Sequence, residues 1–408
     1  MNYIFNKNTD EKQIDDFVIN SEQNNLFQCS NWAKVKNNWH HYFTSMSDED
    51  GKIVASALIL SRDFPLGKKL FYIPRGPVMD YHNKELVEAY FSKIKELAKE
   101  DKAIAVIFDP KVYSRKYLFK DRNENIPLEN EDIVQTLINL GAKHKGYTKM
   151  IIETHQPRYN AEMDVEEGYY DQLDRKTIRS INTSVKKGTE YYYGPEYIDD
   201  FAEAMHYTEE RKGIALRNKD YFQNMIDAYG EDCLLGVAKL NFPKQIKTLE
   251  ERIASAKNDL DNPDISRKQK NTLQESLKND EEELTKIKED YAVEGKDEIV
   301  LTGILAIFNK KMMEIVYMGN NPRAMRIRAS YYLYNKCIEL CEKKHIKECS
   351  FGGIEGTLDD GLTVFKSNFI MNVEEYIGEF TFVLDPLFFN LFDSVYPKLL
   401  TLVGKFRK

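Results

Sequence analysis

Apolar and polar positions along the first 150 residues predict strands and helices in alternation. Lys52–Ser61 is a mostly aliphatic run of strand length, and Asn83–Lys99 carries apolar residues at helical spacing. Ala103–Phe108 is short and wholly apolar, and Asp109 follows it directly. This pattern predicts a buried strand that ends by presenting Asp109 to a loop. We therefore expect an α/β domain over residues 1–150.

The rest of the chain repeats this alternation. Strands are expected at Met150–Thr154, Cys233–Leu240, Ile299–Phe308, Met313–Tyr317 and Glu348–Phe351. Helices are expected at Asp174–Lys187, Pro195–Lys212, Lys219–Tyr229 and Ala324–Lys343. Residues 151–378 are thus predicted to form a second α/β domain, although the two halves share no repeated sequence.

The clearest periodicity lies between two of these strands, within residues 243–291. Apolar residues recur there three and four positions apart on both sides of a break at Pro263. The members of this seam are Ile246, Leu249, Ile253, Ala256, Leu260, Leu273, Leu277, Asp280, Leu284, Ile287 and Tyr291. Such spacing predicts an antiparallel two-helix coiled coil inserted in the second domain, with one polar seam position.

Composition and charge then limit the class of protein. The 408 residues are too many for one ordinary domain, and the net charge is −8. An anionic polymer would therefore need a local basic patch. The five cysteines are few and odd in number, which argues against a disulfide framework. The N-terminus lacks a signal-peptide pattern, and no apolar run is long enough to span a membrane. We expect a cytoplasmic protein.

Several polar residues are candidates for binding or catalysis. Lys36 lies four residues after Trp32, so the two share a helical face. Arg75 is held in a rigid Pro-Arg-Gly-Pro turn, which suits a binding loop and a structural turn equally well. Thr208 and Arg211 are three residues apart on a helix and can converge on one ligand group, although an ordinary surface helix has the same composition.

The segment Phe351–Lys366 is rich in glycine, which permits close approach of backbone to ligand. It contains no dinucleotide or nucleotide-triphosphate motif. Cys337, Cys341, His345 and Cys349 recur at intervals of four, but no CxxC pair is present. We interpret the cysteines as core residues and expect no metal site.

In order along the chain, these segments resemble the Fem family of non-ribosomal peptidyltransferases, which build peptidoglycan cross-bridges. The resemblance runs nearly end to end. It is carried by Gln28-x3-Trp32-x3-Lys36, Tyr72-Ile73-Pro74-Arg75-Gly76-Pro77, Asp109-Pro110, Gln156-Pro157-Arg158, Lys176-Thr177-Ile178-Arg179, Lys186-Lys187-Gly188, Thr208-x2-Arg211-x-Gly213, Tyr317-x-Gly319, Gly352-Gly353-Ile354, Phe365-Lys366 and Glu375-Tyr376-Ile377-Gly378-Glu379. The helical insertion is similar to that of the full-length branch of the family.

The resemblance implies two acetyltransferase-like (GNAT) domains, the first completed by residues 379–408 returning from the C-terminus. It implies aminoacyl-tRNA as co-substrate, no cofactor, and lipid II or UDP-MurNAc-pentapeptide as acceptor. By resemblance, Lys36, Thr208 and Arg211 would hold the pyrophosphate and sugar of the acceptor, and Tyr317 would line its channel. Lys366, with the Phe365 backbone, would lie at the acyl-transfer centre. The family often has an aromatic residue where this chain has Ile214-Ala215, which leaves the pocket's shape open.

Amine attack on an aminoacyl ester creates an oxyanion, and we expect Lys366 to stabilise it. Asp109 is a candidate general base, although a structural Asp-Pro turn accounts for it as well, and the substrate or water could accept the proton instead. The two rival readings are an acyl-CoA-dependent N-acyltransferase on the same fold and a non-catalytic scaffold that binds tRNA or membrane.

Two segments keep two interpretations each. The inserted arm either stiffens or dimerises the protein, or it contacts tRNA. Residues 244–291 carry 10 Lys+Arg and 12 Asp+Glu, a net of −2, so that basic residues of the body such as Lys176, Arg179, Lys186 and Lys187 are an alternative tRNA site. Residues 386–408 are apolar and then basic, and they either pack on the first domain or make a peripheral contact at the inner face of the membrane.

Overall fold

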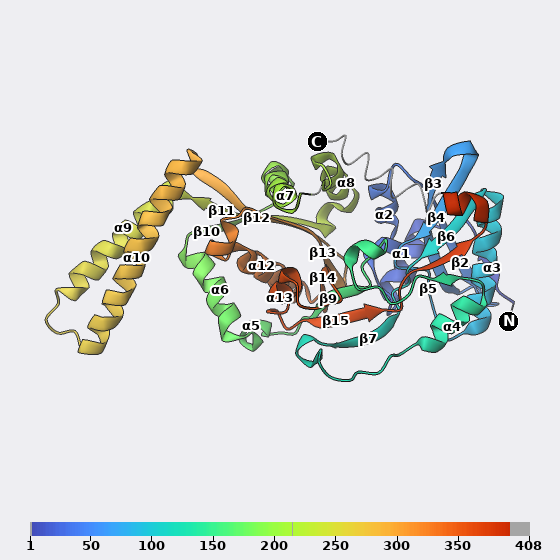
Figure 1. Cartoon of the computed structure of the whole chain (residues 1–408), viewed down its shortest axis with the longest axis horizontal. Helices are drawn as coiled ribbons and strands as arrows, with labels where there is room; N and C mark the ends of the chain where they lie inside the picture. The colour runs from blue at the N-terminus through green and yellow to red at the C-terminus, as the bar shows by residue number, and fades with distance from the viewer. Residues whose placement is uncertain (1, 214, 392–408) are drawn as a thin grey trace.

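A computed structural model describes residues 2–213 and 215–391 as two eight-stranded sheets with helices on their faces (Figure 1). The first sheet has the order β1 (Ile4–Asn6), β2 (His40–Ser47), β3 (Ile53–Phe64), β4 (Lys68–Ile73), β6 (Ala103–Phe108), β16 (Phe380–Val383) and β8 (Lys143–His144), with β5 (Val78–Met79) paired to β3. The helices of this half are α1 (Glu11–Asn20), α2 (Ser30–Val35), α3 (Lys84–Glu100) and α4 (Glu131–Asn139).

The second sheet has the order β10 (Thr189–Tyr193), β11 (Cys233–Asn241), β12 (Glu298–Phe308), β13 (Met312–Asn320), β14 (Glu348–Ile354), β9 (Tyr159–Asp164), β15 (Asn372–Tyr376) and β7 (Tyr113–Leu118). Its helices are α5 (Tyr169–Gln172), α6 (Arg175–Lys186), α7 (Ile198–Lys212), α8 (Lys219–Tyr229), α11 (Ala324–Ile327), α12 (Ala329–Lys344) and α13 (Gly361–Lys366). The expected α/β fold with two sheet-based halves is confirmed.

The two halves exchange strands. β16 comes from the end of the chain and pairs with β6 in the first sheet, within the range expected to return there. β7 belongs by position to the first 150 residues, yet it pairs with β15 at the edge of the second sheet. Each half thus depends on a strand from a distant part of the sequence.

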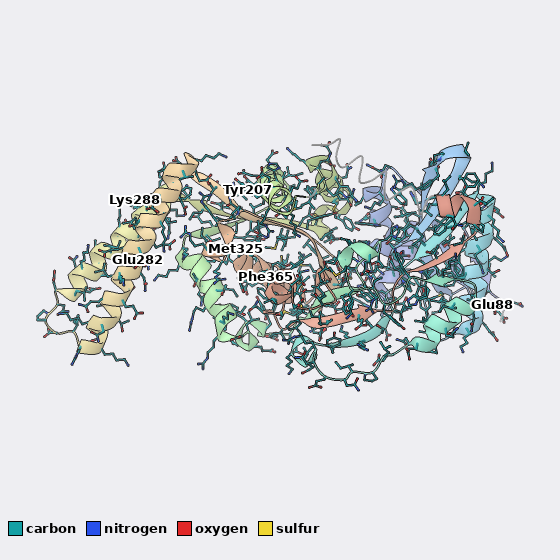
Figure 2. The ribbon with its side chains drawn as sticks, viewed as in Figure 1. Glu88, Tyr207, Glu282, Lys288, Met325 and Phe365 are labelled. Atoms are coloured by element: carbon teal, nitrogen blue, oxygen red, sulfur yellow. The ribbon has the colours of Figure 1, made fainter. Side chains whose placement is uncertain are left out.

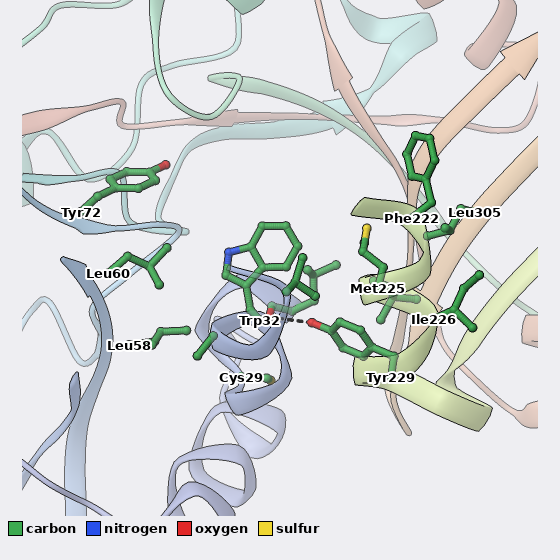
Figure 3. Packing of buried hydrophobic residues seen from close by; sticks show 14 of the residues in the cluster. Cys29, Trp32, Leu58, Leu60, Tyr72, Phe222, Met225, Ile226, Tyr229 and Leu305 are labelled. Atoms are coloured by element: carbon green, nitrogen blue, oxygen red, sulfur yellow. Dashed lines mark hydrogen bonds between the residues drawn. The ribbon is translucent and has the colours of Figure 1, made fainter. Parts of the chain in front are cut away.

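A shared apolar core fills the space between the halves (Figure 3). Trp32 of α2 packs in one cluster with Phe222 and Met225 of α8, and each is less than 5% exposed. The Tyr229 hydroxyl in the same cluster donates to the carbonyl oxygen of Leu26 at 3.5 Å. Because burial of such side chains is worth about 1.5–3 kcal/mol each, this contact fixes the two halves against each other.

Most of the elements that local periodicity predicted are present, and two of the predictions were wrong. The helix expected over Asn83–Lys99 is α3, and its apolar stripe is buried. The strand expected at Met150–Thr154 was wrong: Ile151–Glu153 is a single 3-10 turn. The long helix expected at Ala324–Lys343 is broken at Arg328, whose φ is 65°.

The inserted segment forms a helical hairpin that projects from the body, built from α9 (Phe242–Leu260) and α10 (Arg267–Glu294) (Figure 1). Leu249, Ile253 and Ile287 are at most 9% exposed in the seam between these helices. The polar seam residue Asp280 accepts both hydrogen bonds of Arg252 at 2.6 Å, which explains why a carboxylate is tolerated there. The supercoiling of a coiled coil stays a prediction.

Ion pairs attach the base of the hairpin to the body. Arg326 binds Glu283 and Asp290 of α10, and Lys187 binds Glu283 at 3.0 Å. Lys186 lies 3.4 Å from Asp280. Two of the basic residues suggested for tRNA binding are therefore already engaged by the hairpin.

The apolar C-terminal segment is described only as far as residue 391. Phe388 and Phe389 pack on the core shared by the halves, as expected for a segment that covers the first domain. Residues 392–408, which complete this prediction and the membrane alternative, lie outside the described residues. Among the described residues, no helix combines the length and the apolar character needed to cross a bilayer.

Candidate functional site

The second sheet opens at the junction of β13 and β14. These parallel strands pair only from Met312–Glu314 to Glu348–Ser350, and beyond this point each continues without the other. Gly352, at the opening, has a φ of 77°, which favours glycine. A Cβ on Gly353 would lie 2.4 Å from Pro157 Cγ, so this position also needs glycine. The Gly352-Gly353 pair therefore shapes the opening and leaves its carbonyl groups available.

Lys366 places its ammonium group at this opening. Nζ donates to the carbonyl oxygens of Gly352 at 3.3 Å and Gly353 at 2.8 Å, and the residue is 4% exposed. Burial lowers the Lys366 pKa to about 7, while the charges of Glu314 and Asp360 act to raise it. Among the described residues, no carboxylate forms an ion pair with this ammonium group. A lysine with three N–H donors and two fixed carbonyl partners keeps one donor for a ligand.

Short-range contacts fix the helix that carries Lys366. The Asp360 carboxylate caps α13 by accepting from the backbone N–H of Leu362 at 2.8 Å and Thr363 at 3.1 Å. Phe365, labelled in Figure 2, packs edge-on against Tyr331 and Tyr334 of α12 with ring centroids 5.0 Å apart. The Phe365 ring thus holds α13 against its neighbour, next to the buried lysine.

Glu314 is a buried carboxylate at the same opening that sequence reasoning missed. It is 8% exposed, and the Ser350 hydroxyl, which accepts from Gly352 N at 3.2 Å, hydrogen-bonds to it. Burial raises the Glu314 pKa, and the charges of Lys111 and Arg75 oppose that rise. A charged residue inside the apolar run Met312–Ile315 was the available signal.

Lys36 and Tyr317 form a second cluster through a residue that was not predicted, Tyr221. Lys36 Nζ lies 4.7 Å from the Trp32 ring centroid and donates to the Tyr221 hydroxyl at 3.0 Å. Tyr221 meets the Tyr317 ring edge-on at 6.2 Å. Burial, followed by the charge of Arg217, lowers the Lys36 pKa to about 8. Two candidate substrate-binding residues are therefore brought together.

Thr208 and Arg211 lie on the last turns of α7. The Thr208 hydroxyl is buried and accepts from the backbone N–H of Asn320 at 3.0 Å, which joins α7 to the end of β13. A Cβ on Gly319 would lie 2.4 Å from the Ala204 backbone, so the helix rests directly on that strand. Arg211 is exposed, and it makes no hydrogen bond or ion pair with any described residue. Its guanidinium is thus available to a ligand.

Arg75 and Asp109 lie deeper, between the two halves. Asp109 is 3% exposed and accepts from Arg75 N at 2.6 Å and from the Tyr72 hydroxyl at 2.8 Å. Burial raises the Asp109 pKa to about 6 despite the nearby Arg75 charge. The Arg75 guanidinium donates to the Pro157 carbonyl at 2.7 Å and lies 4.3 Å from the Tyr376 ring centroid. The Asp109 and Arg75 side chains therefore hold neighbouring segments of the chain together.

The two clusters occupy opposite faces of the second sheet. Tyr317 packs with the core beneath α7 and α8, which takes Leu305 and Ile307 from β12. Phe365 packs with the core beneath α6 and α12, which takes the alternate residues of that strand. Because alternate residues of a strand face opposite sides, the Lys36–Tyr317 cluster and α13 approach the opening of β13 and β14 from different sides.

Comparisons with known proteins agree with this arrangement. The sequence profile described as the FemAB family matches residues 9–397. A "Lipid II:glycine glycyltransferase" of Staphylococcus aureus is 28% identical over 412 residues, covering 95% of each chain. A protein of the same name from Staphylococcus epidermidis is 26% identical over 412 residues, covering 96% of each.

The structural comparison leads to the same family. The crystal structure of FemX is similar with a TM-score of 0.72 and 25% sequence identity, covering 96% of this chain and 99% of that one. The match therefore includes both sheets. With the profile spanning almost the entire sequence, the chain belongs to the FemAB family.

Proposed function

We propose that this protein transfers an aminoacyl group from aminoacyl-tRNA to an amine of a peptidoglycan precursor, lipid II or UDP-MurNAc-pentapeptide. The observation that carries this proposal is the buried Lys366 ammonium at the opening of β13 and β14, with its partners Gly352 and Gly353. Family membership and the names of the staphylococcal relatives support the same chemistry. Aminoacyl-tRNA serves as co-substrate, and the proposed reaction needs no cofactor.

The reaction forms one bond and breaks one. The acceptor amine attacks the ester carbonyl carbon, a C–N bond forms, and the carbonyl oxygen becomes an oxyanion. The remaining Lys366 N–H donor stabilises this oxyanion. When the tetrahedral intermediate collapses, the C–O bond to the ribose breaks, and the proton lost by the attacking amine ends on the ribose oxygen. Because the ester is already activated, positioning of the two substrates supplies much of the rate enhancement.

The acceptor is expected on the face of α7 and α8. Lys36 and the exposed Arg211 supply cations for the pyrophosphate, and Tyr317 supplies an aromatic wall. Thr208 positions α7 on β13 through its bond to Asn320 N, so we assign it to the support of this site. Arg75, which contacts Pro157 and the Tyr376 ring, has no contact with this cluster, and its expected part in substrate binding stays a prediction. The enzyme would act in the cytoplasm, at the inner face of the membrane when the acceptor is lipid-linked.

A donor assay tests the proposal against the acyl-CoA rival. Purified protein is given the muropeptide acceptor with either labelled aminoacyl-tRNA or labelled acetyl-CoA. We expect label in the muropeptide only from the tRNA donor. Transfer from acetyl-CoA alone would establish the rival enzyme, and transfer from neither donor would support a non-catalytic scaffold.

A further inference from the structure

The Glu314 carboxylate lies beside the proposed acyl-transfer centre but has no role in the steps described so far. Glu314 is the last residue of β13 that pairs with β14. A Cβ on Gly352 would lie 3.9 Å from Glu314 Oε1, and the carbonyl oxygen of the same glycine accepts from Lys366 Nζ at 3.3 Å. The carboxylate and the ammonium group therefore approach the same residue of the opening.

Strand alternation directs Glu314 toward the acceptor. Met313 and Ile315, its neighbours in β13, pack in the core beneath α6 and α12. Because alternate residues of a strand face opposite sides, Glu314 points to the other face of the sheet. That face carries the Lys36–Tyr317 cluster, which the proposed function assigns to the acceptor. An acceptor amine that enters the opening from this face meets the Glu314 carboxylate.

A small hollow, which we call the Glu314 hollow, reaches the same carboxylate from solvent. Its volume of about 130 Å³ has room for several water molecules. Its lining includes Glu314, the part-buried Asp15 and the exposed Asp232. Cys29 and Tyr229, both labelled in Figure 3, contribute to its wall. The hollow therefore connects a buried carboxylate with polar residues at the surface.

The proposed reaction needs a route for one proton. Lysine side chains and α-amino groups have pKa values of about 8 to 10, so an acceptor amine of either kind is largely an ammonium ion at neutral pH. An ammonium ion has no lone pair for attack and must first lose a proton. The next proton, which the amine loses on attack, ends on the ribose oxygen. One proton per transfer therefore leaves for solvent.

The charges around Glu314 suit a proton acceptor. Burial raises the Glu314 pKa, and the charge of Glu374 acts in the same direction, so the carboxylate is a stronger base than an exposed one. The Ser350 hydroxyl and the charges of Lys111 and Arg75 oppose that rise, which keeps the ionised form accessible.

We propose that Glu314 accepts the proton that leaves the acceptor ammonium ion and releases it to solvent through the Glu314 hollow. This inference rests on the proposed function and extends it by assigning the proton acceptor. An N–H bond of the ammonium ion breaks, its electron pair stays on nitrogen for the attack, and an O–H bond forms on Glu314. Water in the hollow then takes the proton and restores the carboxylate. Asp109, the acceptor suggested by the sequence, has both oxygens occupied by Arg75 N and the Tyr72 hydroxyl.

Two acceptors that differ in basicity test the assignment in the full-length enzyme. One is the muropeptide, and the other is the same muropeptide with an aminooxy group, which is neutral at pH 7, in place of the accepting amine. Glu314→Gln should lower the ratio of the amine rate to the aminooxy rate by about 10², a usual contribution of a general base. The ratio cancels any effect on the charge of Lys366, because both acceptors need the same oxyanion donor. Rates without enzyme are subtracted, since aminooxy groups also attack esters in solution.

Glu162→Gln is the matched control. Glu162 is another buried carboxylate on the same face of the sheet, because it pairs with Ser350, which in turn pairs with Glu314. It does not line the hollow, so its substitution should leave the ratio unchanged. Ile19→Trp narrows the hollow from a part-buried position on α1 and leaves Glu314 in place, so it should lower the ratio as well.

A wild-type ratio in Glu314→Gln would overturn the inference. This holds whether both rates are normal or both fall together, since a parallel fall would make the residue structural. Normal aminooxy transfer by the variant shows that it is folded. An unchanged ratio in Ile19→Trp would overturn the route through the hollow. If the unmodified enzyme transfers an aminoacyl group to neither acceptor, the proposed function itself fails.

Discussion

Lys366 Nζ donates to the carbonyl oxygen of Gly353 at 2.8 Å, at the opening between β13 and β14. Two neutral carbonyls stabilise this buried ammonium group, and its third N–H remains free of them. We predict that Lys366→Met lowers kcat by about 10²–10³, as loss of one oxyanion donor does in other acyl-transfer enzymes, with acceptor binding preserved. Calorimetric titration with the muropeptide and single-turnover assays measure both quantities. Near-normal turnover would contradict the assignment.

The pH dependence of turnover should reflect the charge of Lys366. Its pKa is about 7, and only the protonated form has both the positive charge and a third N–H left for an oxyanion, so activity should fall as pH rises through 7. Glu314 raises that pKa, and Glu314→Gln should therefore move the falling limb to lower pH. The control is Glu162→Gln, which removes another buried carboxylate that is not among the charges acting on Lys366. If the falling limb of the pH–activity profile stays at the wild-type pH in Glu314→Gln, the Glu314 charge does not act on Lys366.

Arg211 should act on acceptor binding. Its exposed guanidinium has no described partner, and a phosphate contact persists in both ground and transition states. Arg211→Ala should therefore raise the acceptor KM by about 10- to 100-fold, as expected for a charge-assisted hydrogen bond, with kcat less affected. Arg211→Lys should recover part of this loss because the charge is retained. Initial rates with UDP-MurNAc-pentapeptide provide the test, and an acceptor KM unchanged within error would refute the phosphate role.

Asp109 should contribute to structure more than to proton transfer. Both of its oxygens accept hydrogen bonds, from Arg75 N and the Tyr72 hydroxyl, and it is 3% exposed. Asp109→Asn should leave the shape of the pH–rate profile unchanged. Its raised pKa of about 6 means that the protonated form favours folding, and this contribution is lost as pH rises through 6. Thermal unfolding of the wild type and Asp109→Asn at pH 5 and 8 measures the effect. If Asp109→Asn instead lost the limb of the pH–rate profile near pH 6, Asp109 would be assigned as the catalytic base.

The helical hairpin should be dispensable for donor binding. Its net charge is −2 over residues 244–291, and its base is held by Arg326 and Lys187 of the body. Deletion of residues 255–278 with a short turn in their place would keep the Arg252–Asp280 pair and shorten only the distal arm. We expect donor KM within about twofold of wild type, since few phosphate contacts are lost. A tenfold rise would assign the arm to tRNA.

The sequence predicted the positions of helices and strands better than it predicted which of them lie side by side. The apolar stripe of α3 follows from local spacing, and Leu86, Tyr90, Ile94 and Leu97 are all buried. The exchange of β7 into the second sheet depends on pairing across more than 250 residues, which periodicity does not encode. The broken helix at Arg328 likewise depends on tertiary packing that overrides propensity.

The candidate site shows the same division. The family resemblance pointed to Lys36 and Tyr317, and the structure joins them through Tyr221 of α8. Nothing in the local sequence distinguishes Tyr221 from the other 24 of the chain's 25 tyrosines. Glu314 was more accessible to inference, because a carboxylate within an apolar strand needs a compensating partner.

The proposed activity is aminoacyl transfer from tRNA to a peptidoglycan precursor. The most direct test incubates the enzyme with a mixture of charged tRNAs and with lipid II or UDP-MurNAc-pentapeptide, followed by mass spectrometry of the muropeptide. We expect the muropeptide to gain the mass of one amino-acid residue or more, and this gain to disappear when the tRNAs are deacylated beforehand. A muropeptide that keeps its original mass with every charged tRNA and both acceptors would contradict it.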